Sequence, residues 1–313
     1  MSIHELSMSQ WGGKFRATLK DCAALTKPHT LHLVVGVIPA MLLAQRGVIA
    51  PVLIVNVVGA TILMTAGANT LNCVGDADID KLMVRTAGRP LARNALSTRF
   101  ALTFGVALSA GAVLWLWQAA NLLAALLAAA TIAFYALIYT LLIKRRTAHN
   151  VVWGGLANGM PLLIGWSAVT GAIGWQAVVM LAIVFFWTPP HSWALAIMRK
   201  QDYISAGVPM LPAVAAERNV ARRILIYSWL TGLTTVVLAI GTGAIYDAVS
   251  VLAASWFVGT AHQLDARTRH GQPTDARHLF RRASIYLTIV LCALAIDSAL
   301  ALPTTLHWPA SRT

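Results

Sequence analysis

The sequence predicts an all-α polytopic membrane protein, and its composition is the first reason. Of the 313 residues, 58% are hydrophobic and only 11% are charged, whereas soluble domains contain about 25% charged residues. Residues 100–143 contain no Asp, Glu, Lys or Arg, and neither do residues 147–198. Uncharged segments of this length exclude a soluble enzyme, a disordered chain and a disulfide scaffold.

Nine segments have the length and apolar character of membrane-spanning helices, which need about 20 residues. They lie at residues 31–48, 50–73, 100–117, 119–143, 151–171, 173–197, 224–245, 247–264 and 283–302. Residues 1–30 form a polar N-terminal tail without a long apolar core, which excludes a cleavable signal peptide. We therefore expect a single nine-helix domain over 31–302, followed by a short tail over 303–313.

The lysines and arginines predict the orientation. Of the 24, 22 lie in the tail and in alternate connections, at 1–30, 74–99, 144–150, 198–223 and 265–282. Basic residues are enriched on the cytoplasmic side of membrane proteins. We expect a cytoplasmic N-terminus and an outer C-terminus in a bacterial cell inner membrane. The net charge of +13 is therefore explained by the basic residues that fix the orientation in the membrane, and we expect no nucleic acid as partner.

The cytoplasmic loops 74–99 and 198–223 are longer than turns require, so we expect catalytic groups there. Residues 69–93 read NTLNCVGDADIDKLMVRTAGRPLAR, with Asn72, Asp76 and Asp80 spaced i, i+4, i+8. If the second helix continues, these three side chains share one face and Asp78 points elsewhere. Three oxygen-bearing side chains suit Mg²⁺, which takes one or two carboxylates together with substrate phosphates.

Basic residues follow this row directly, at Lys81, Arg85, Arg89 and Arg93. Carboxylates beside guanidinium groups at a membrane surface indicate a diphosphate site. The alternative is a solvated helix end with surface ion pairs, which contribute little.

The pattern NxxxDxxxD followed by RTxxRPL resembles the first signature of the UbiA-type intramembrane prenyltransferases. The resemblance implies nine helices around a central cavity open to membrane lipid. It also implies that Mg²⁺ on Asn72, Asp76 and Asp80 holds a prenyl diphosphate, which Arg85 and Arg89 grip. Lys144 and Arg145, from the matching stretch YTLLIKRRT, would face the diphosphate, although a positive-inside anchor explains these residues equally well.

The second loop resembles one branch of that family. Residues 186–212 read FWTPPHSWALAIMRKQDYISAGVPMLP, which is similar to the protohaem farnesyltransferases. Phenol-directed members have a second DxxxD here, whereas this chain has RKQDY with Asp202 as the single acid. The resemblance implies transfer of a farnesyl group from farnesyl diphosphate to a vinyl group of protohaem, with addition of water, giving haem O for terminal oxidases.

Two alternatives to this function stay open. One is a prenyltransferase acting on a phenol or quinone precursor, and the other is a non-enzymatic haem-handling assembly subunit. Haem A synthase and terminal oxidase assembly factors are implied as partners. Three positions depart from the family pattern, namely His29, Ala77 and Gln201, where usual basic or acidic residues are absent.

The end of the sixth predicted span is the candidate acceptor site. His191 follows Pro189-Pro190, which interrupt the helix, and Arg199 lies two turns further along the same face. Haem iron accepts imidazole, and propionates pair with cations. The residues expected to contact haem are His191, Trp193, Arg199, Lys200 and Asp202. Alternatively, His191 satisfies the interrupted backbone and Arg199 anchors the helix end. An acid in the last span, Asp297, is expected to make a structural hydrogen bond or to lie exposed at the interface.

Overall fold

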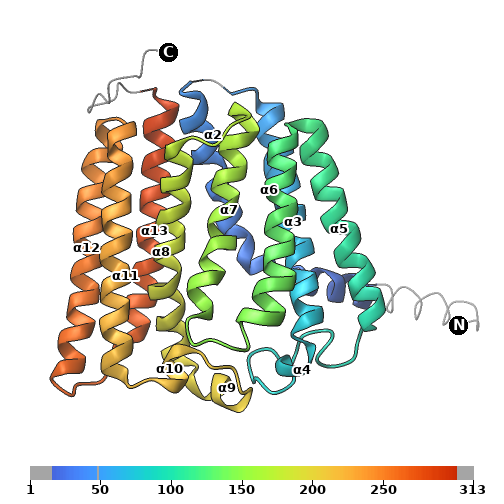
Figure 1. The fold of residues 1–313 in the computed structure, drawn as a ribbon, viewed down its shortest axis with the longest axis vertical. Coiled ribbons are helices and arrows are strands. Elements are labelled where there is room, and N and C mark those ends of the chain that lie inside the picture. Colours follow the sequence, from blue (N-terminus) through green and yellow to red (C-terminus); the bar gives the residue numbers. More distant parts are fainter. Residues whose placement is uncertain (1–15, 48, 302–313) are drawn as a thin grey trace, which may run out of the picture.

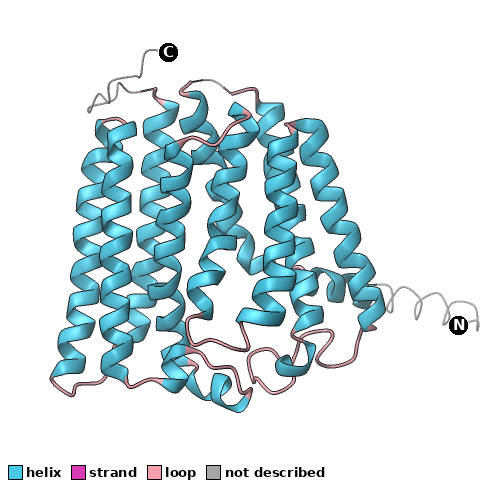
Figure 2. Cartoon of the chain, in the orientation of Figure 1, coloured by secondary structure: helices cyan, strands magenta, loops and turns pink. Residues whose placement is uncertain are grey.

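The computed structural model describes residues 16–47 and 49–301, and every regular element in this range is helical (Figures 1 and 2). Most of the predicted tail, residues 1–15, and the whole tail 303–313 lie outside the described residues. The elements are η1 (Pro28–Gly36), α2 (Val37–Gln45), α3 (Pro51–Gly75), α4 (Ala77–Asp80), α5 (Thr98–Ala119), α6 (Leu122–Ala133), η2 (Phe134–Ile143), α7 (Asn150–Thr170), α8 (Trp175–Met198), α9 (Lys200–Ser205), α10 (Leu211–Val214), α11 (Glu217–Leu238), η3 (Ala239–Gly241), α12 (Ala244–Arg269) and α13 (Ala276–Ala299).

Seven helices in the described part of the chain are long and apolar enough to cross a membrane. They are α3, α5, α6 with η2, α8, α11 with η3, α12 and α13. The prediction of a multi-pass helical membrane protein is therefore confirmed, whereas the count of nine spans is not. The predicted span 31–48 is a 3₁₀ helix followed by the short α2. The predicted span 151–171 is α7, in which glycines and asparagines lower the hydropathy.

The long helices stand side by side as a bundle (Figure 1). α3 packs on α5, α7 on α8, and α11 on both α8 and α12, while α2 packs on α7 and α13. Large apolar side chains remain exposed along the bundle, among them Val52 and Leu252, each 71% exposed. Such exposure would cause aggregation in water and is expected where the surroundings are lipid.

Two glycines bring α7 against the backbone of α8. A Cβ atom at Gly155 would lie 2.8 Å from the carbonyl oxygen of Phe185, and one at Gly159 would lie 2.9 Å from that of Leu181. Small residues at helix interfaces in membranes permit this close approach. Asn158 lies between the two glycines in sequence, so this contact also fixes its position.

Both long loops lie at one end of the bundle, as predicted. This end carries α4 from the first loop and α9 and α10 from the second (Figure 1), and we call it the loop end. The helical residues 16–25 also lie near it, because Asp21 forms an ion pair with Arg93 and Leu25 belongs to the same buried cluster as Leu91.

Asp297 has a structural role at the opposite end. Its carboxylate accepts hydrogen bonds from the backbone of Gly243 at 2.7 Å and of Tyr246 at 3.3 Å. These amides lie at the residue before α12 and in its first turn, where the leading N–H groups have no partner within the helix. The expectation of a structural hydrogen bond is confirmed, and the exposed alternative is wrong because the residue is 2% exposed.

Candidate active site

Asn72, Asp76 and Asp80, which we call the acid row, lie at the loop end, where α3 ends at Gly75 and α4 begins at Ala77. The backbone leaves the helical conformation at Asp76, but the hydrogen bonds across four residues continue. The Asp76 amide donates to the Asn72 carbonyl and the Asp80 amide to the Asp76 carbonyl, both at 2.9 Å. Asn72, Asp76 and Asp80 are buried, whereas the Asp78 side chain is 65% exposed. The structure thus places the three residues on one inward face and Asp78 outside it, which is the geometry that the spacing predicts.

Each member of the acid row contacts a basic side chain from a different segment. Lys144 Nζ lies 2.5 Å from Asp76 Oδ2, and Arg89 Nη1 lies 2.7 Å from both carboxylate oxygens of Asp80. Lys27 Nζ donates to Asn72 Oδ1. Loop 74–99, the loop after η2 and the segment before η1 therefore converge here, with positive charge against two buried carboxylates.

Lys27 is the one contact of this set that the sequence reasoning did not single out. It is 7% exposed and adopts the left-handed backbone conformation, with φ of 52°. Burial lowers the pKa of its ammonium group to about 8, because removal from water disfavours the charged form. In the sequence, the Lys27-Pro28 dipeptide was the only sign of a site at Lys27, because Asn72, the partner of Lys27, is distant in sequence.

Arg145 contacts the exposed acid rather than the buried row. Its guanidinium makes two hydrogen bonds to Asp78, at 2.6 and 2.7 Å, and one to the Gly75 carbonyl at 2.6 Å. The hydrogen bonds from Arg145 lower the pKa of Asp78 to about 2. This pair ties the loop after η2 to the end of α3, and the structure does not bring Arg145 into contact with Asp76 or Asp80.

A π-helix aligns the residues that lead into the site. In η2, Thr140 Oγ1 donates to the Tyr135 carbonyl at 2.7 Å, and the Lys144 amide donates to the Tyr139 carbonyl at 2.8 Å, each across five residues. Thr140 Oγ1 also accepts from Asn72 Nδ2 at 2.9 Å. The wider turn thereby directs Thr140 and Lys144 toward the acid row, and such turns often occur at functional sites.

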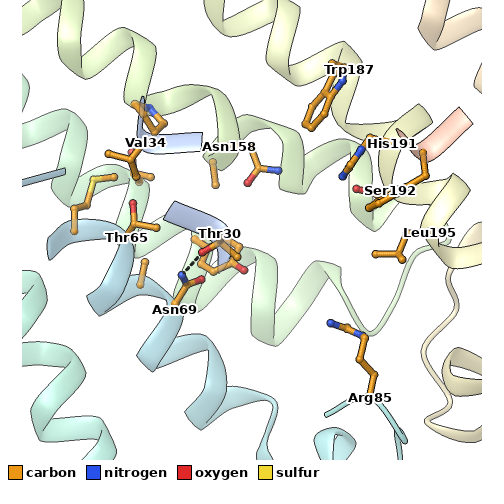
Figure 3. A pocket seen from close by; sticks show the side chains of 17 residues that line it. Thr30, Val34, Thr65, Asn69, Arg85, Asn158, Trp187, His191, Ser192 and Leu195 are labelled. Carbon is orange, nitrogen blue, oxygen red and sulfur yellow. Dashed lines mark hydrogen bonds between the residues drawn. The ribbon is translucent and has the colours of Figure 1, made fainter. Parts of the chain in front are cut away.

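A cavity of about 440 Å³ opens within the bundle, beside the acid row. Its polar lining comprises Thr30, Thr65, Asn69, Arg85, Thr131, Tyr135, Asn158, His191 and Ser192, and its apolar lining includes Val34, Met64, Trp187, Leu195 and Phe280 (Figure 3). Asn69 lies one helical turn before Asn72, so α3 presents the cavity wall and the acid row in succession. Arg85 reaches toward the cavity from the loop after α4 (Figure 3).

His191 is held rigidly at one side of this cavity. Its ring stacks between Trp187 and Phe280, with ring centroids 4.4 Å away on both sides. Trp187 is fixed in turn by a hydrogen bond of 2.8 Å from its Nε1 to the Ala283 carbonyl. Both ring faces of His191 are therefore covered, and the edge of the imidazole is the part that faces the cavity.

Other residues expected at the acceptor site lie outside the cavity lining. Trp193 is fully buried on another side of α8, where it packs edge-on against Tyr227 with centroids 5.5 Å apart. Arg199 and Lys200 are exposed where α8 ends, and Lys81, expected at the diphosphate, is exposed as well. Asp202 is buried on α9.

The profile of the UbiA prenyltransferase family matches residues 33–285. The chain belongs to the UbiA prenyltransferase family. It is 58% identical over 308 residues to a protohaem IX farnesyltransferase of Mycolicibacterium smegmatis, covering 98% of this chain and 100% of the relative. It is 60% identical over 305 residues to the protein of that name from Mycobacterium avium, covering 97% and 99%.

Solved UbiA-type structures share the fold. A digeranylgeranylglyceryl phosphate synthase superposes with a TM-score of 0.74 at 17% identity, covering 90% of this chain and 98% of that one. A UbiA homologue from Archaeoglobus fulgidus, bound to DMAPP and Mg²⁺, gives a TM-score of 0.66 at 14% identity, covering 88% and 99%. At these identities the likeness establishes the fold of this UbiA family member.

The acid row supplies only part of the ligand shell that a divalent cation needs. Within residues 16–47 and 49–301, no group of three or more His, Cys, Asp or Glu side chains could hold a metal ion. Asp76 Oδ1 is nevertheless buried and has no hydrogen-bond partner within the described chain. Two carboxylates with an unpaired oxygen suit Mg²⁺, which completes its octahedral shell with water and substrate phosphates.

Proposed function

We propose that this UbiA family member is a protohaem IX farnesyltransferase, which joins the farnesyl group of farnesyl diphosphate to a vinyl group of protohaem and yields haem O. The observation that carries the proposal is the buried row of Asn72, Asp76 and Asp80, paired with cations, one helical turn from Asn69 in the wall of the cavity. The names of relatives 58% and 60% identical over nearly the full length support the two substrates.

In the donor site, the cations that now contact the acid row are within reach of a bound diphosphate. Lys144, Arg89 and Lys27 would share their hydrogen bonds between the carboxylates and the phosphate oxygens, and Arg85 would close the site from the loop after α4. Mg²⁺ on Asp76, Asp80 and Asn72 would supply Lewis-acid neutralisation of the diphosphate. Fixed positive groups in a site of low water content stabilise the charge that develops as the C–O bond breaks.

The cavity would receive the farnesyl chain and the reactive edge of protohaem. Its volume of about 440 Å³ lies within the usual range for small-molecule sites. Apolar walls such as Val34, Met64 and Leu195 protect the allylic cation from premature capture by water. The vinyl group then attacks the first carbon of the farnesyl chain, and water adds beside the porphyrin ring.

For the acceptor, we propose that His191 contacts the haem from the cavity wall, where its stacked ring is fixed in orientation. Arg199 and Lys200 at the end of α8 would pair with the propionates at the membrane surface, and Asp202 on α9 would border this region. Trp193 would act only indirectly, through the packing of α8. The exposed Lys81, together with Arg145, would add positive charge near the donor entrance.

A nine-span topology remains our proposal for the membrane arrangement. The two additional crossings would be η1 with α2, and α7, both of which pack inside the bundle. The basic connections place the loop end and the N-terminus in the cytoplasm and the C-terminus outside, in a bacterial inner membrane. Haem A synthase and terminal oxidase assembly factors are the proposed partners that receive or use the product.

One incubation tests this function against its alternatives. Membranes containing the protein are supplied with haem, farnesyl diphosphate and Mg²⁺, and the extracted haem is analysed by mass spectrometry. We expect a haem heavier by one farnesyl group and one hydroxyl group, and no such product when the diphosphate is omitted. Unmodified haem together with prenylation of an added phenol or quinone precursor would refute the proposal in favour of a phenol-directed enzyme. Binding of haem without any transfer would indicate an assembly subunit.

A further inference from the structure

Two polar side chains in the cavity lack the hydrogen bonds that their neighbours make. The only hydrogen bond of the Asn158 side chain to a described residue runs from Nδ2 to Thr188 Oγ1, at 3.4 Å. The hydroxyl of Ser192 forms none within the described chain, although it lines the same cavity. In contrast, the cavity-lining hydroxyl of Thr131 donates to its own helix, to the Leu127 carbonyl at 2.7 Å.

Asn158 and Ser192 lie close to each other across the α7–α8 contact. Thr188, the partner of Asn158, is four residues before Ser192 on α8, which corresponds to about 6 Å along one helix face. Gly155 and Gly159 on either side of Asn158 hold α7 against the α8 backbone. The amide of Asn158 and the side chain of Ser192 extend into the same part of the cavity (Figure 3).

Asn158 Oδ1 and the Ser192 hydroxyl have no hydrogen-bond partner among the described residues, so both remain able to bind a polar group inside the cavity. A farnesyl chain carries no polar group that could satisfy either of them. A water molecule could, because buried waters typically have two to four polar partners. Asn158 and Ser192 both line this cavity, next to His191.

We propose that Asn158 and Ser192 hold the water molecule that adds to the haem side chain after farnesyl transfer. This inference rests on the proposed function, because only a vinyl acceptor leaves a cation that must be hydrated.

The proposed step balances without any further reagent. The C–O bond of the diphosphate breaks with its electron pair on oxygen, and the terminal vinyl carbon bonds to the first farnesyl carbon. The positive charge is then on the carbon beside the porphyrin ring. The held water forms a C–O bond to that carbon, and the resulting oxonium loses its proton to the departing diphosphate. Without a positioned water, the same cation loses a proton from the adjacent carbon and becomes an alkene.

The product itself therefore reports on the two residues. We would compare Asn158→Leu, Ser192→Ala and the double variant with the unchanged protein, in membranes given haem, farnesyl diphosphate and Mg²⁺. Mass analysis separates the hydrated product from an alkene lighter by one water. Thr131→Val is the matched control, because it removes a cavity hydroxyl that is already paired with its own helix. The hydrated product of the unchanged protein, taken through the same extraction, controls for chemical dehydration.

We expect the ratio of alkene to hydrated product to rise at least about tenfold in the double variant, and to stay unchanged in Thr131→Val. An unchanged ratio in the double variant would overturn the inference, and so would a loss of total prenylation without any alkene. If Asn158→Leu does not accumulate in membranes, the smaller change Ser192→Ala must still raise the ratio, or the inference is wrong. Absence of any prenylated haem from the unchanged protein would instead refute the proposed function.

Discussion

The contrast between Asp76 and Asp78 offers the sharpest test of the acid row. Both are aspartates in the same short segment, and both contact a cation from the loop after η2, Lys144 in one case and Arg145 in the other. They differ in surroundings, because the Asp76 side chain is 1% exposed and the Asp78 side chain 65% exposed. Replacing each by Asn removes one charge with almost no change in shape.

For Asp76→Asn, the loss falls on a buried carboxylate with a free oxygen. We expect transfer to slow by at least roughly 10²–10³-fold, the usual effect of removing one preorganised electrostatic contact. Breaking a buried ion pair costs about 3–5 kcal/mol, and the partial exposure of Lys144, 18%, reduces that cost. For Asp78→Asn, an exposed pair is lost, which is worth about 0.2–1 kcal/mol, and we expect transfer to fall less than about fivefold.

The assay is transfer of radiolabelled farnesyl to haem in membranes with matched protein levels. Thermal unfolding of the purified protein in detergent serves as the control for folding. A similar loss of transfer in Asp76→Asn and Asp78→Asn would refute the one-face geometry. Full activity of Asp76→Asn would refute the donor site altogether.

Three further predictions concern topology, acceptor and stability. Single cysteines at the exposed positions Gly88 and Ser205 should react with a membrane-impermeant thiol reagent only from the cytoplasmic side. A cysteine at Ala172 should react only from outside. Labelling of Gly88 and Ser205 from opposite faces would contradict the single active face. His191→Ala should raise the haem concentration required for half-maximal transfer at least about fivefold and leave farnesyl diphosphate binding within about twofold, whereas the reverse pattern would assign His191 to the donor. Asp297→Ala should lower the free energy of unfolding in detergent by about 1–3 kcal/mol, because two buried amides lose their acceptor. Farnesyl diphosphate binding should stay unchanged. Unchanged thermal stability would show that these hydrogen bonds contribute little.

The sequence predicts what depends on local periodicity. Uncharged apolar segments identified the long helices, and the i, i+4, i+8 spacing identified the buried face of Asn72, Asp76 and Asp80 because backbone hydrogen bonds continue through that segment. Periodicity could also have separated Trp193 from His191. Residues two apart on a helix differ by about 200° in direction, and Trp193 indeed packs away from the cavity.

What depends on contacts between distant segments could not be predicted in this way. Lys27 approaches Asn72 only through the tertiary fold, and its left-handed conformation has no signature in a Lys-Pro dipeptide. The prediction that Pro189-Pro190 interrupt the helix is wrong, because α8 runs through both prolines, packed against neighbouring helices. The predicted face from His191 to Arg199 is also incomplete, because α8 ends at Met198 and leaves Arg199 exposed. That Asn158 Oδ1 and the Ser192 hydroxyl have no partner among the described residues becomes visible only once the α7–α8 contact is known.

The π-helix η2 sets the direction of the residues that follow it. A π-turn holds one residue more than an α-turn, so the same residues wound as an ordinary α-helix would complete more rotation over Phe134–Ile143. Each extra residue that the π-turns hold corresponds to about 100° of rotation for the residues beyond them. Lys144 would then turn away from Asp76 while the helix stayed equally apolar. Insertion and folding in the membrane would tolerate such a change, whereas catalysis would not, so the register of this helix is constrained by chemistry rather than by the bilayer.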